Sequence, residues 1–186
     1  MRETFGMNIK ERISERISLC QVRELCLWAQ KDQDRMDELY RLSHDVSDRI
    51  AVNALWILTH ADMNDVSNRV WLETKREDLI YYIMRETVTS KLRLMLHLMM
   101  HLQVKPSDVR PDFIDFCIQK ITDTSQPYAI RSSCIKLAYE QMHHYPELLQ
   151  ELVGILDLLA QEALSPGLDS ARRQVLKKIS KGRKTK

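Results

Sequence analysis

Glycine and proline are scarce in this chain of 186 residues, which contains four glycines and five prolines. A loop that cradles a phosphate group needs clustered glycines, so that backbone N–H groups can approach the ligand. The four glycines here are isolated from one another, so the sequence excludes nucleotide binding by a P-loop or a Rossmann motif. With so few turn-forming residues, we expect long elements joined by short connections.

The signatures of several enzyme classes are missing as well. The sequence holds no G-x-S-x-G nucleophile elbow and no H-E-x-x-H zinc motif. No stretch approaches the roughly 20 apolar residues of a membrane span, and the charged residues 1–18 lack the apolar core of a signal peptide. We therefore expect a non-enzymatic, cytoplasmic protein with no cofactor and no membrane association.

Cysteine is sparse and shows no pattern of a cross-linked or metal-bound fold. The four cysteines have neither CxxC pairing nor zinc-ligand spacing, and they are Cys20, Cys26, Cys117 and Cys134. Each lies among apolar neighbours, which predicts free, buried thiols.

Two histidines, His97 and His101, are spaced i, i+4 and would project from one face of a helix. Such a pair can chelate a metal ion, but the sequence offers no third ligand nearby. The two residues continue the polar stripe of Arg93, which favours a face directed to solvent or to a binding groove. A single E-x-x-H motif, Glu140 to His143, lacks the second copy that a di-iron carboxylate bundle needs. No metal site is expected.

The chain is rich in straight-chain residues that favour helices, which predicts an all-α fold. Periodic apolar runs between the prolines predict paired helices. The pairs are 34–47 with 48–60, 65–86 with 90–103, 111–124 with 128–144, and 146–164 with 170–181. The segment 65–86 has a candidate break near Lys75, and "VRELCLWAQ" from Val22 resembles the second helix of an earlier, degenerate pair.

The C-terminal region is basic, with eight Lys or Arg and no acidic residue in 170–186. Before it, Pro166 and Gly167 predict the end of one helix, with Asp169 or Ser170 capping the next. We expect residues 1–181 to form a single domain and residues 182–186 a basic tail. This tail is either simply solvated or makes a weak electrostatic contact with nucleic acid or an acidic protein.

The predicted second helices begin alike, with an arginine near the start of each. These arginines are Arg23, Arg49, Arg93, Arg131 and Arg172. Most of them are about 40 residues apart, a period typical of stacked helix pairs. A positive charge near a helix N-terminus opposes the macrodipole, so the arginines need local partners such as Asp48, Asp123 or Asp169. We predict a structural role for them.

These features resemble HEAT repeats, with armadillo-like repeats a close alternative. The segment "PDFIDFCIQKITDTSQPYAIRSSCIKLAYEQM" fits the family pattern best, with Asp123 in the turn and Arg131 opening the second helix. The segment that contains Asp169 and Arg172 fits nearly as well. The resemblance implies a right-handed α-α superhelix, a solenoid of about four helix pairs with an N-terminal helical cap. It also implies an Asp–Arg ladder through adjacent repeats and second helices that line the concave face.

The two layers of predicted helices differ in charge, because the first helices are net negative and the second helices net positive. The resemblance then implies an acidic outer surface and a mildly basic groove, suited to an acidic protein or peptide. We predict a non-enzymatic interaction module that binds a protein or peptide partner through the concave face. The residues expected to contact the partner are Asn53, Trp56, His60, Arg93, His97, His101, Lys136 and Lys177.

Nucleic-acid binding is the alternative function. Some bacterial alkylpurine DNA glycosylases are built from HEAT-like repeats that hold the duplex in a strongly basic concave face. In this sequence the predicted groove has few Lys or Arg before residue 170, and no positions match the glycosylase catalytic set. The alternative is therefore DNA or RNA contact through the basic C-terminal helix. Salt dependence and a requirement for residues 170–186 would distinguish the two functions.

Overall fold

The computed structural model describes residues 8–183, and every regular element in that range is helical. The elements are α1 (Ile9–Arg12), α2 (Leu19–Ala29), α3 (Gln33–Leu42), α4 (Asp48–Leu58), α5 (Val66–Thr74), α6 (Arg76–Ile83), α7 (Thr89–Met99), the 3-10 helix η1 (Pro106–Asp108), α8 (Pro111–Thr122), α9 (Tyr128–Met142), α10 (Pro146–Leu159) and α11 (Pro166–Arg183). The all-α prediction is confirmed.

Side-chain caps and prolines determine where several helices begin. Before α2, the Ser18 Oγ accepts a hydrogen bond from the Gln21 N–H at 3.3 Å, and the Gln21 Oε1 accepts one from the Ser18 N–H at 2.8 Å. This reciprocal pair is a capping box. Proline opens α8, α10 and α11, at Pro111, Pro146 and Pro166. Its missing N–H has no cost there, because the first N–H groups of a helix lack intrahelical partners.

The last helix begins earlier than predicted. α11 starts at Pro166 rather than at Ser170, and the Ser165 Oγ accepts a hydrogen bond from the N–H of the third helical residue at 3.3 Å. Gly167 therefore lies inside the first turn, and the predicted cap at Asp169 or Ser170 was wrong. A serine directly before a proline is a signal for a helix start, and this signal outweighed the stop suggested by Pro and Gly.

Other boundaries both support and revise the sequence prediction. The break near Lys75 is confirmed, since that residue separates α5 from α6. α7 ends at Met99, so His101 lies in the turn after the helix rather than on its face. α11 continues past Gly182, where the tail was expected, and the remaining residues of that tail, 184–186, lie outside the described range.

The chain divides into two compact units. Unit 1 comprises residues 1–75 and 86–98, and unit 2 comprises residues 76–85 and 99–186. The single domain 1–181 remains a prediction, and the two units are described separately below.

In unit 1, α4 packs against α2 and α3. Its apolar side contributes Ala51, Ala54 and Leu55, each of them fully buried. Trp71 of α5 is also buried, and its Nε1–H donates to the Asp37 Oδ1 of α3 at 2.9 Å. Trp71 is thus a packing residue, and its one polar group is satisfied by a carboxylate.

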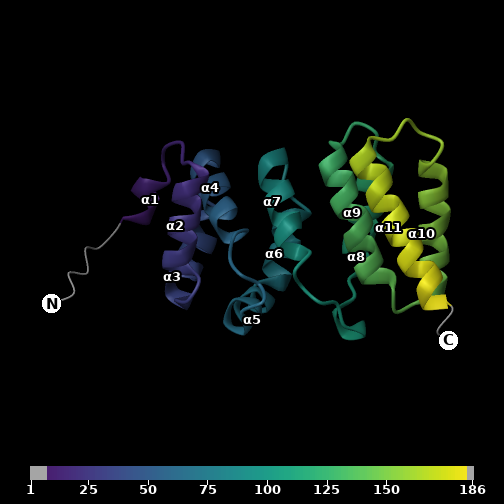
Figure 1. The fold of residues 1–186 in the computed structure, drawn as a ribbon, viewed down its shortest axis with the longest axis horizontal. Helices are drawn as coiled ribbons and strands as arrows, with labels where there is room; N and C mark the ends of the chain where they lie inside the picture. The colour runs from purple at the N-terminus through teal and green to yellow at the C-terminus, as the bar shows by residue number, and fades with distance from the viewer. Residues whose placement is uncertain (1–7, 184–186) are drawn as a thin grey trace. The chain divides into compact units, whose positions relative to one another are not determined.

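In unit 2, α9 packs against α8, α10 and α11, and Figure 1 shows α8 and α11 beside it. The buried residues of α9 are spread around the helix rather than along one stripe, which is typical of a helix covered on several sides. They are Ile130, Arg131, Cys134, Ile135, Leu137, Ala138, Gln141 and Met142. The predicted helix pairs α8/α9 and α10/α11 are therefore neighbours, and α9 packs against both helices of the second pair.

Candidate partner-binding surfaces

Arg131, near the start of α9, joins the two helix pairs of unit 2. Its side chain is 2% exposed, and its Nε–H donates to the Ile121 carbonyl oxygen in the last turn of α8 at 2.9 Å. Its Nη2–H donates to the Glu162 Oε2, in the connection from α10 to α11, at 2.8 Å. The last carbonyls of a helix have no intrahelical partner and carry partial negative charge. The guanidinium therefore stabilises the end of α8, and the structural role predicted for Arg131 is confirmed.

The partner of Arg131 differs from the predicted one. Asp123 instead organises the turn between α8 and α9, where its Oδ1 accepts hydrogen bonds from the Ser125 Oγ at 2.6 Å and the Ser125 N–H at 2.9 Å. Its Oδ2 accepts a third from the Gln126 Nε2 at 2.8 Å. These bonds, that from the Ser125 hydroxyl foremost, hold the pKa of Asp123 below its ordinary value. Both oxygens of the Asp123 carboxylate are therefore used within the turn, and Arg131 pairs with Glu162 instead.

Arg172 of α11 repeats the geometry in the next pair. Its Nε–H donates to the Leu156 carbonyl oxygen in the last turn of α10 at 2.6 Å. Its guanidinium also lies 3.4 Å from the Asp157 carboxylate and 3.9 Å from that of Asp169. The other three arginines of the series are exposed and make no such contact with the described part of the chain, namely Arg23, Arg49 and Arg93. The structural role therefore holds for the two C-terminal members.

Among the residues predicted to bind a partner, Asn53 is used by the fold itself. Its side chain is buried in unit 1, and its Nδ2 donates to the carbonyl oxygens of Ile13 at 3.0 Å and Glu15 at 2.8 Å. The segment after α1 lies over this amide, so Asn53 anchors that segment to α4. We leave Asn53 out of the binding surface for this reason.

Four other predicted residues of unit 1 are accessible. Trp56 is half-buried, and its ring makes a T-shaped contact with that of His60, with centroids 6.2 Å apart. The exposed His60 also holds its Nδ1 2.9 Å from the Trp56 carbonyl oxygen. Arg93 and His97 are exposed on α7. Their contribution to binding remains a prediction, as does that of the exposed His101 in unit 2.

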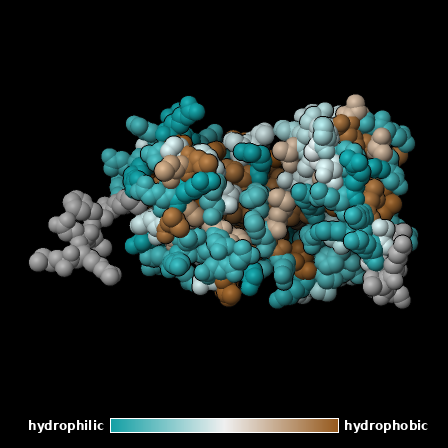
Figure 2. Space-filling view, in the orientation of Figure 1, coloured by the Kyte–Doolittle hydropathy of each residue, from teal (hydrophilic) through white to brown (hydrophobic). Residues whose placement is uncertain are grey.

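The exposed sides of α9 and α11 form what we call the second-helix surface of unit 2. It carries Lys136 and Lys177, both exposed and without an ion pair among residues 8–183. Lys136 borders a hollow of about 220 Å³ whose walls include the apolar side chains of Met100 and Val175. Across the hollow, Lys178 pairs with Glu140 at 3.2 Å. Figure 2 shows mixed hydrophilic and hydrophobic residues over this region.

Much of the positive charge of α11 is neutralised within unit 2. Arg172 is held against α10, Arg173 pairs with Asp169 at 3.0 Å, and Lys178 pairs with Glu140. The helix is therefore less cationic at its surface than its sequence indicates. This arrangement weakens the electrostatic case for binding a nucleic-acid backbone.

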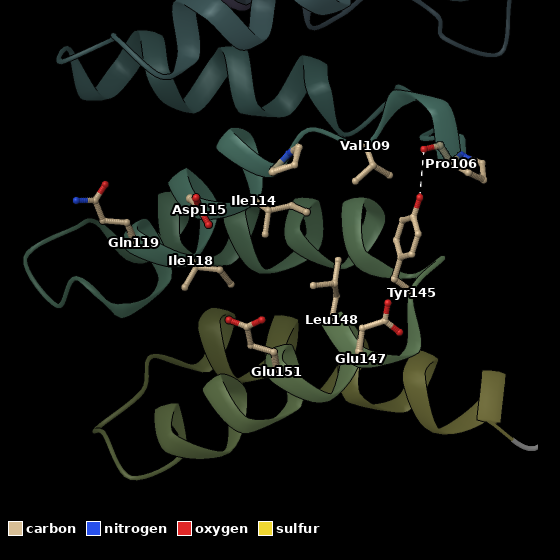
Figure 3. Close-up of a pocket in the computed structure, with 11 residues that line it drawn as sticks. Pro106, Val109, Ile114, Asp115, Ile118, Gln119, Tyr145, Glu147, Leu148 and Glu151 are labelled. Atoms are coloured by element: carbon tan, nitrogen blue, oxygen red, sulfur yellow. Dashed lines mark hydrogen bonds between the residues drawn. The ribbon is translucent and has the colours of Figure 1, made fainter.

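A larger hollow, which we call the first-helix groove, lies on the side of unit 2 formed by α8, α10 and the η1 segment. Its volume is about 640 Å³. Its apolar lining consists of Pro106, Val109, Pro111, Ile114, Ile118, Tyr145 and Leu148. Figure 3 shows Ile114, Ile118 and Leu148 between the two helices, with the carboxylates of Asp115, Glu147 and Glu151 beside them. The sequence prediction missed this groove, although Glu147 and Glu151 are spaced i, i+4 and flank Leu148.

The thiols differ in exposure. Cys26, Cys117 and Cys134 are buried as predicted, whereas Cys20 is exposed in the first turn of α2. The expectation of burial for Cys20 was wrong because the apolar side of α2 begins with Val22 and Leu25, which lie on a different face. Burial raises the pKa of Cys26 to about 11 and that of Cys117 well above its ordinary value.

Within residues 8–183, no three His, Cys, Asp or Glu side chains gather into a group that could hold a metal ion. None of the helices in that range combines the length and the apolar character needed to cross a membrane.

Comparison with known proteins gives one positive result. Residues 9–179 match a family model described as a HEAT repeat domain. The match begins at α1 and ends within α11, so it includes both units. Neither the curated proteins nor the solved structures gave a match.

Proposed function

Because the chain belongs to the HEAT repeat domain family, we propose that it is a non-enzymatic module that binds a protein partner through its second helices. Helix-pair repeats stack into extended surfaces, and such surfaces bind other macromolecules without catalytic residues. The observation that carries the proposal is the exposure of Lys136 on α9 and Lys177 on α11, each without a neutralising acid among the described residues.

The chemistry of the second-helix surface favours an acidic segment that also carries an apolar side chain. Lys136 stands at the edge of the hollow, where it can pair with a carboxylate. The partly exposed Met100 offers an apolar contact in the same hollow, and a methionine adapts readily to differently shaped partners. A desolvated apolar anchor beside charge pairs is the usual arrangement of a binding hot spot.

A protein partner fits better than a nucleic acid. A duplex requires several unneutralised cations along one face, because affinity rises with the number of phosphates that are contacted. On α11, Arg172, Arg173 and Lys178 already have partners within unit 2. Nucleic-acid binding through α11 is the alternative function, and an NMR titration with duplex DNA tests it.

The proposal extends to unit 1 through the exposed members of the predicted set. These are Trp56 and His60 of α4 and Arg93 and His97 of α7. We also propose that the second helices line a concave face and that the protein is cytoplasmic.

Charge reversal tests the proposed surface directly. We would measure the affinity of a fluorescently labelled peptide rich in Asp, Glu and Leu for the wild type and for the double variant Lys136→Glu/Lys177→Glu. Loss of two favourable charge contacts should weaken binding about tenfold or more, since 1.4 kcal/mol corresponds to a factor of ten. The matched control, Arg16→Glu/Lys31→Glu, makes the same change of net charge at two exposed residues of unit 1.

The control separates a local site from a general charge effect. The proposal holds if the control binds within about twofold of the wild type, a difference well below 1 kcal/mol. Equal weakening of both double variants would show that the peptide responds only to net charge, and the second-helix surface would lose its role.

A further inference from the structure

We infer that the first-helix groove is a second docking surface, which takes a basic amphipathic helix from a partner protein. This inference is independent of the proposed role of α9 and α11, because the groove is lined only by residues of the η1 segment, α8, α10 and their adjoining turns. The charged residues that line the groove are acidic, whereas the second-helix surface carries exposed lysines.

The floor of the groove is apolar and open to a ligand. Ile118 and Leu148 are only half-buried, and Val109 and Tyr145 complete the walls (Figure 3). The volume of about 640 Å³ lies within the range of roughly 300–1,000 Å³ that is typical of ligand sites. The groove can therefore bury more than one apolar side chain of a partner.

The rim is acidic, with no Lys or Arg among the lining residues. Asp115 comes from α8, whereas Glu147 and Glu151 come from α10, and all three are exposed. None of the three carboxylates makes a hydrogen bond or ion pair with any residue in the described part of the chain. Charge complementarity therefore selects a cationic ligand and excludes acidic peptides and nucleic acids.

The arginine between the lining residues Val109 and Pro111 does not neutralise this rim. Arg110 precedes α8, and its guanidinium pairs with the Asp112 carboxylate at 2.7 Å and with that of Glu77. Both of those acids lie outside the lining of the groove. The three rim carboxylates thus remain available to lysines or arginines of a partner.

The geometry favours a helical ligand over an extended one. Strand addition requires an exposed sheet edge, and residues 8–183 contain no strand. The groove instead runs between α8 and α10, where Ile114 and Ile118 are one helical turn apart, as are Glu147 and Glu151. A helix with leucines at i, i+4 and lysines beside them would match both spacings, since its side chains repeat with the same period.

The experiment uses a labelled amphipathic peptide of Leu and Lys, with its leucines along one helical face. Two further peptides serve as controls, one with the same composition in scrambled order and one with Glu in place of Lys. We expect the amphipathic basic peptide to bind the wild type at least about tenfold more tightly than either control peptide. Binding should also weaken as the salt concentration rises, because the charge pairs are exposed.

A triple charge reversal locates the site. The variant Asp115→Lys/Glu147→Lys/Glu151→Lys should lose binding about tenfold or more. Its matched control, Glu15→Lys/Asp34→Lys/Asp78→Lys, changes the net charge equally at exposed acids outside the groove and should bind like the wild type. In methyl NMR spectra, the peptide should shift the resonances of Ile118 and Leu148.

Several results would overturn the inference. Equal binding of the ordered and scrambled peptides would indicate non-specific attraction to an acidic protein. Equal losses in the two triple variants, or methyl shifts that leave Ile118 and Leu148 unchanged, would place the peptide elsewhere. Absence of peptide binding with concentration-dependent self-association, lost in the groove variant, would assign the groove to a second copy of this chain.

Discussion

The Nη2 of Arg131 lies 2.8 Å from the Oε2 of Glu162, and this contact links the helix pair α8/α9 to the connection inside the pair α10/α11. The arginine side chain is 2% exposed and that of the glutamate 33% exposed. Water can therefore solvate the Glu162 carboxylate if Arg131 is removed, but it can solvate the buried Arg131 guanidinium far less well if Glu162 is removed. This asymmetry yields a stability prediction.

We expect Glu162→Ala to destabilise the fold more than Arg131→Met. Removal of the carboxylate leaves a buried guanidinium without its counter-charge, which should cost about 3 kcal/mol. In Arg131→Met, water can solvate the glutamate, and the main loss is the hydrogen bond to the Ile121 carbonyl, about 1–2 kcal/mol. The measurement is the free energy of unfolding in urea. Gln161→Ala, at an exposed neighbour, should change it by less than about 0.5 kcal/mol.

The double variant completes this test. Arg131→Met/Glu162→Ala should be no less stable than Glu162→Ala, because it removes the stranded charge. An arginine variant as mild as Gln161→Ala would contradict a structural role for Arg131.

Asn53 gives a second stability prediction. Asn53→Ala removes the donor to two carbonyl oxygens and should lower the free energy of unfolding by about 1–3 kcal/mol. Amide hydrogen exchange should also become faster near Ile13 and Glu15. Asn64→Ala, which removes an exposed amide, is the control and should have little effect. Weaker partner binding at full stability would return Asn53 to the binding surface.

Asp37 predicts a pH dependence of stability in unit 1. Its Oδ1 lies 2.7 Å from the Lys75 Nζ and accepts a hydrogen bond from the Trp71 Nε1 at 2.9 Å. These contacts, that with Lys75 foremost, lower the pKa of Asp37 below its ordinary 3.8. A lowered carboxyl pKa stabilises the fold above the unfolded value, and that stabilisation is lost as the pH falls through the folded value.

The variant Asp37→Asn isolates this contribution. The carboxylate is half-exposed, so the variant should be less stable than the wild type by no more than about 1 kcal/mol at neutral pH. The difference should shrink as the pH falls below 3.8. Urea unfolding at a series of pH values measures it, and the Trp71 indole N–H resonance reports the protonation directly. If the stability difference between the wild type and Asp37→Asn grew as the pH fell, the stabilising role of the Asp37 carboxylate would be contradicted.

Cys20 should be the one rapidly reacting thiol among the four cysteines. It is exposed, whereas the other three are buried. The thiolate is the reactive form, and a pKa of about 11 leaves Cys26 protonated at mildly alkaline pH. In native protein, a disulfide reagent should modify one thiol quickly and the remaining three only after unfolding. Cys20→Ser should abolish the fast phase. Any rapidly modified thiol that remained in this variant would contradict the burial of the other three cysteines.

The sequence predicted those features that depend on local spacing. Prolines and apolar periodicity located the helix pairs, and the break at Lys75 lies where it was expected. The repeated position of Arg131 and Arg172 indicated structural anchors, because a cation near a helix N-terminus needs a compensating partner. These features require only the geometry of single helices and of their period along the chain.

Features that depend on tertiary contacts could not be predicted in this way. Glu162 is 31 residues from Arg131, so its selection over Asp123 depended on the neighbouring pair. Asn53 was taken for a surface residue because the covering segment after α1 comes from far along the chain. The first-helix groove was missed because Asp115 and Glu151 belong to different helices, which come together only when α8 and α10 both pack against α9.

The most direct test of the proposed function is a pair of NMR titrations of isotope-labelled protein at near-physiological salt, one with the acidic peptide and one with mixed-sequence duplex DNA. Shortening the chain would be a poor substitute, because α11 contributes Ala171, Val175 and Ile179 to the core. We expect the peptide to shift amide resonances around Lys136 and Lys177, while duplex DNA produces no comparable shifts. Shifts of those resonances by DNA, with none from the peptide, would contradict the proposed function.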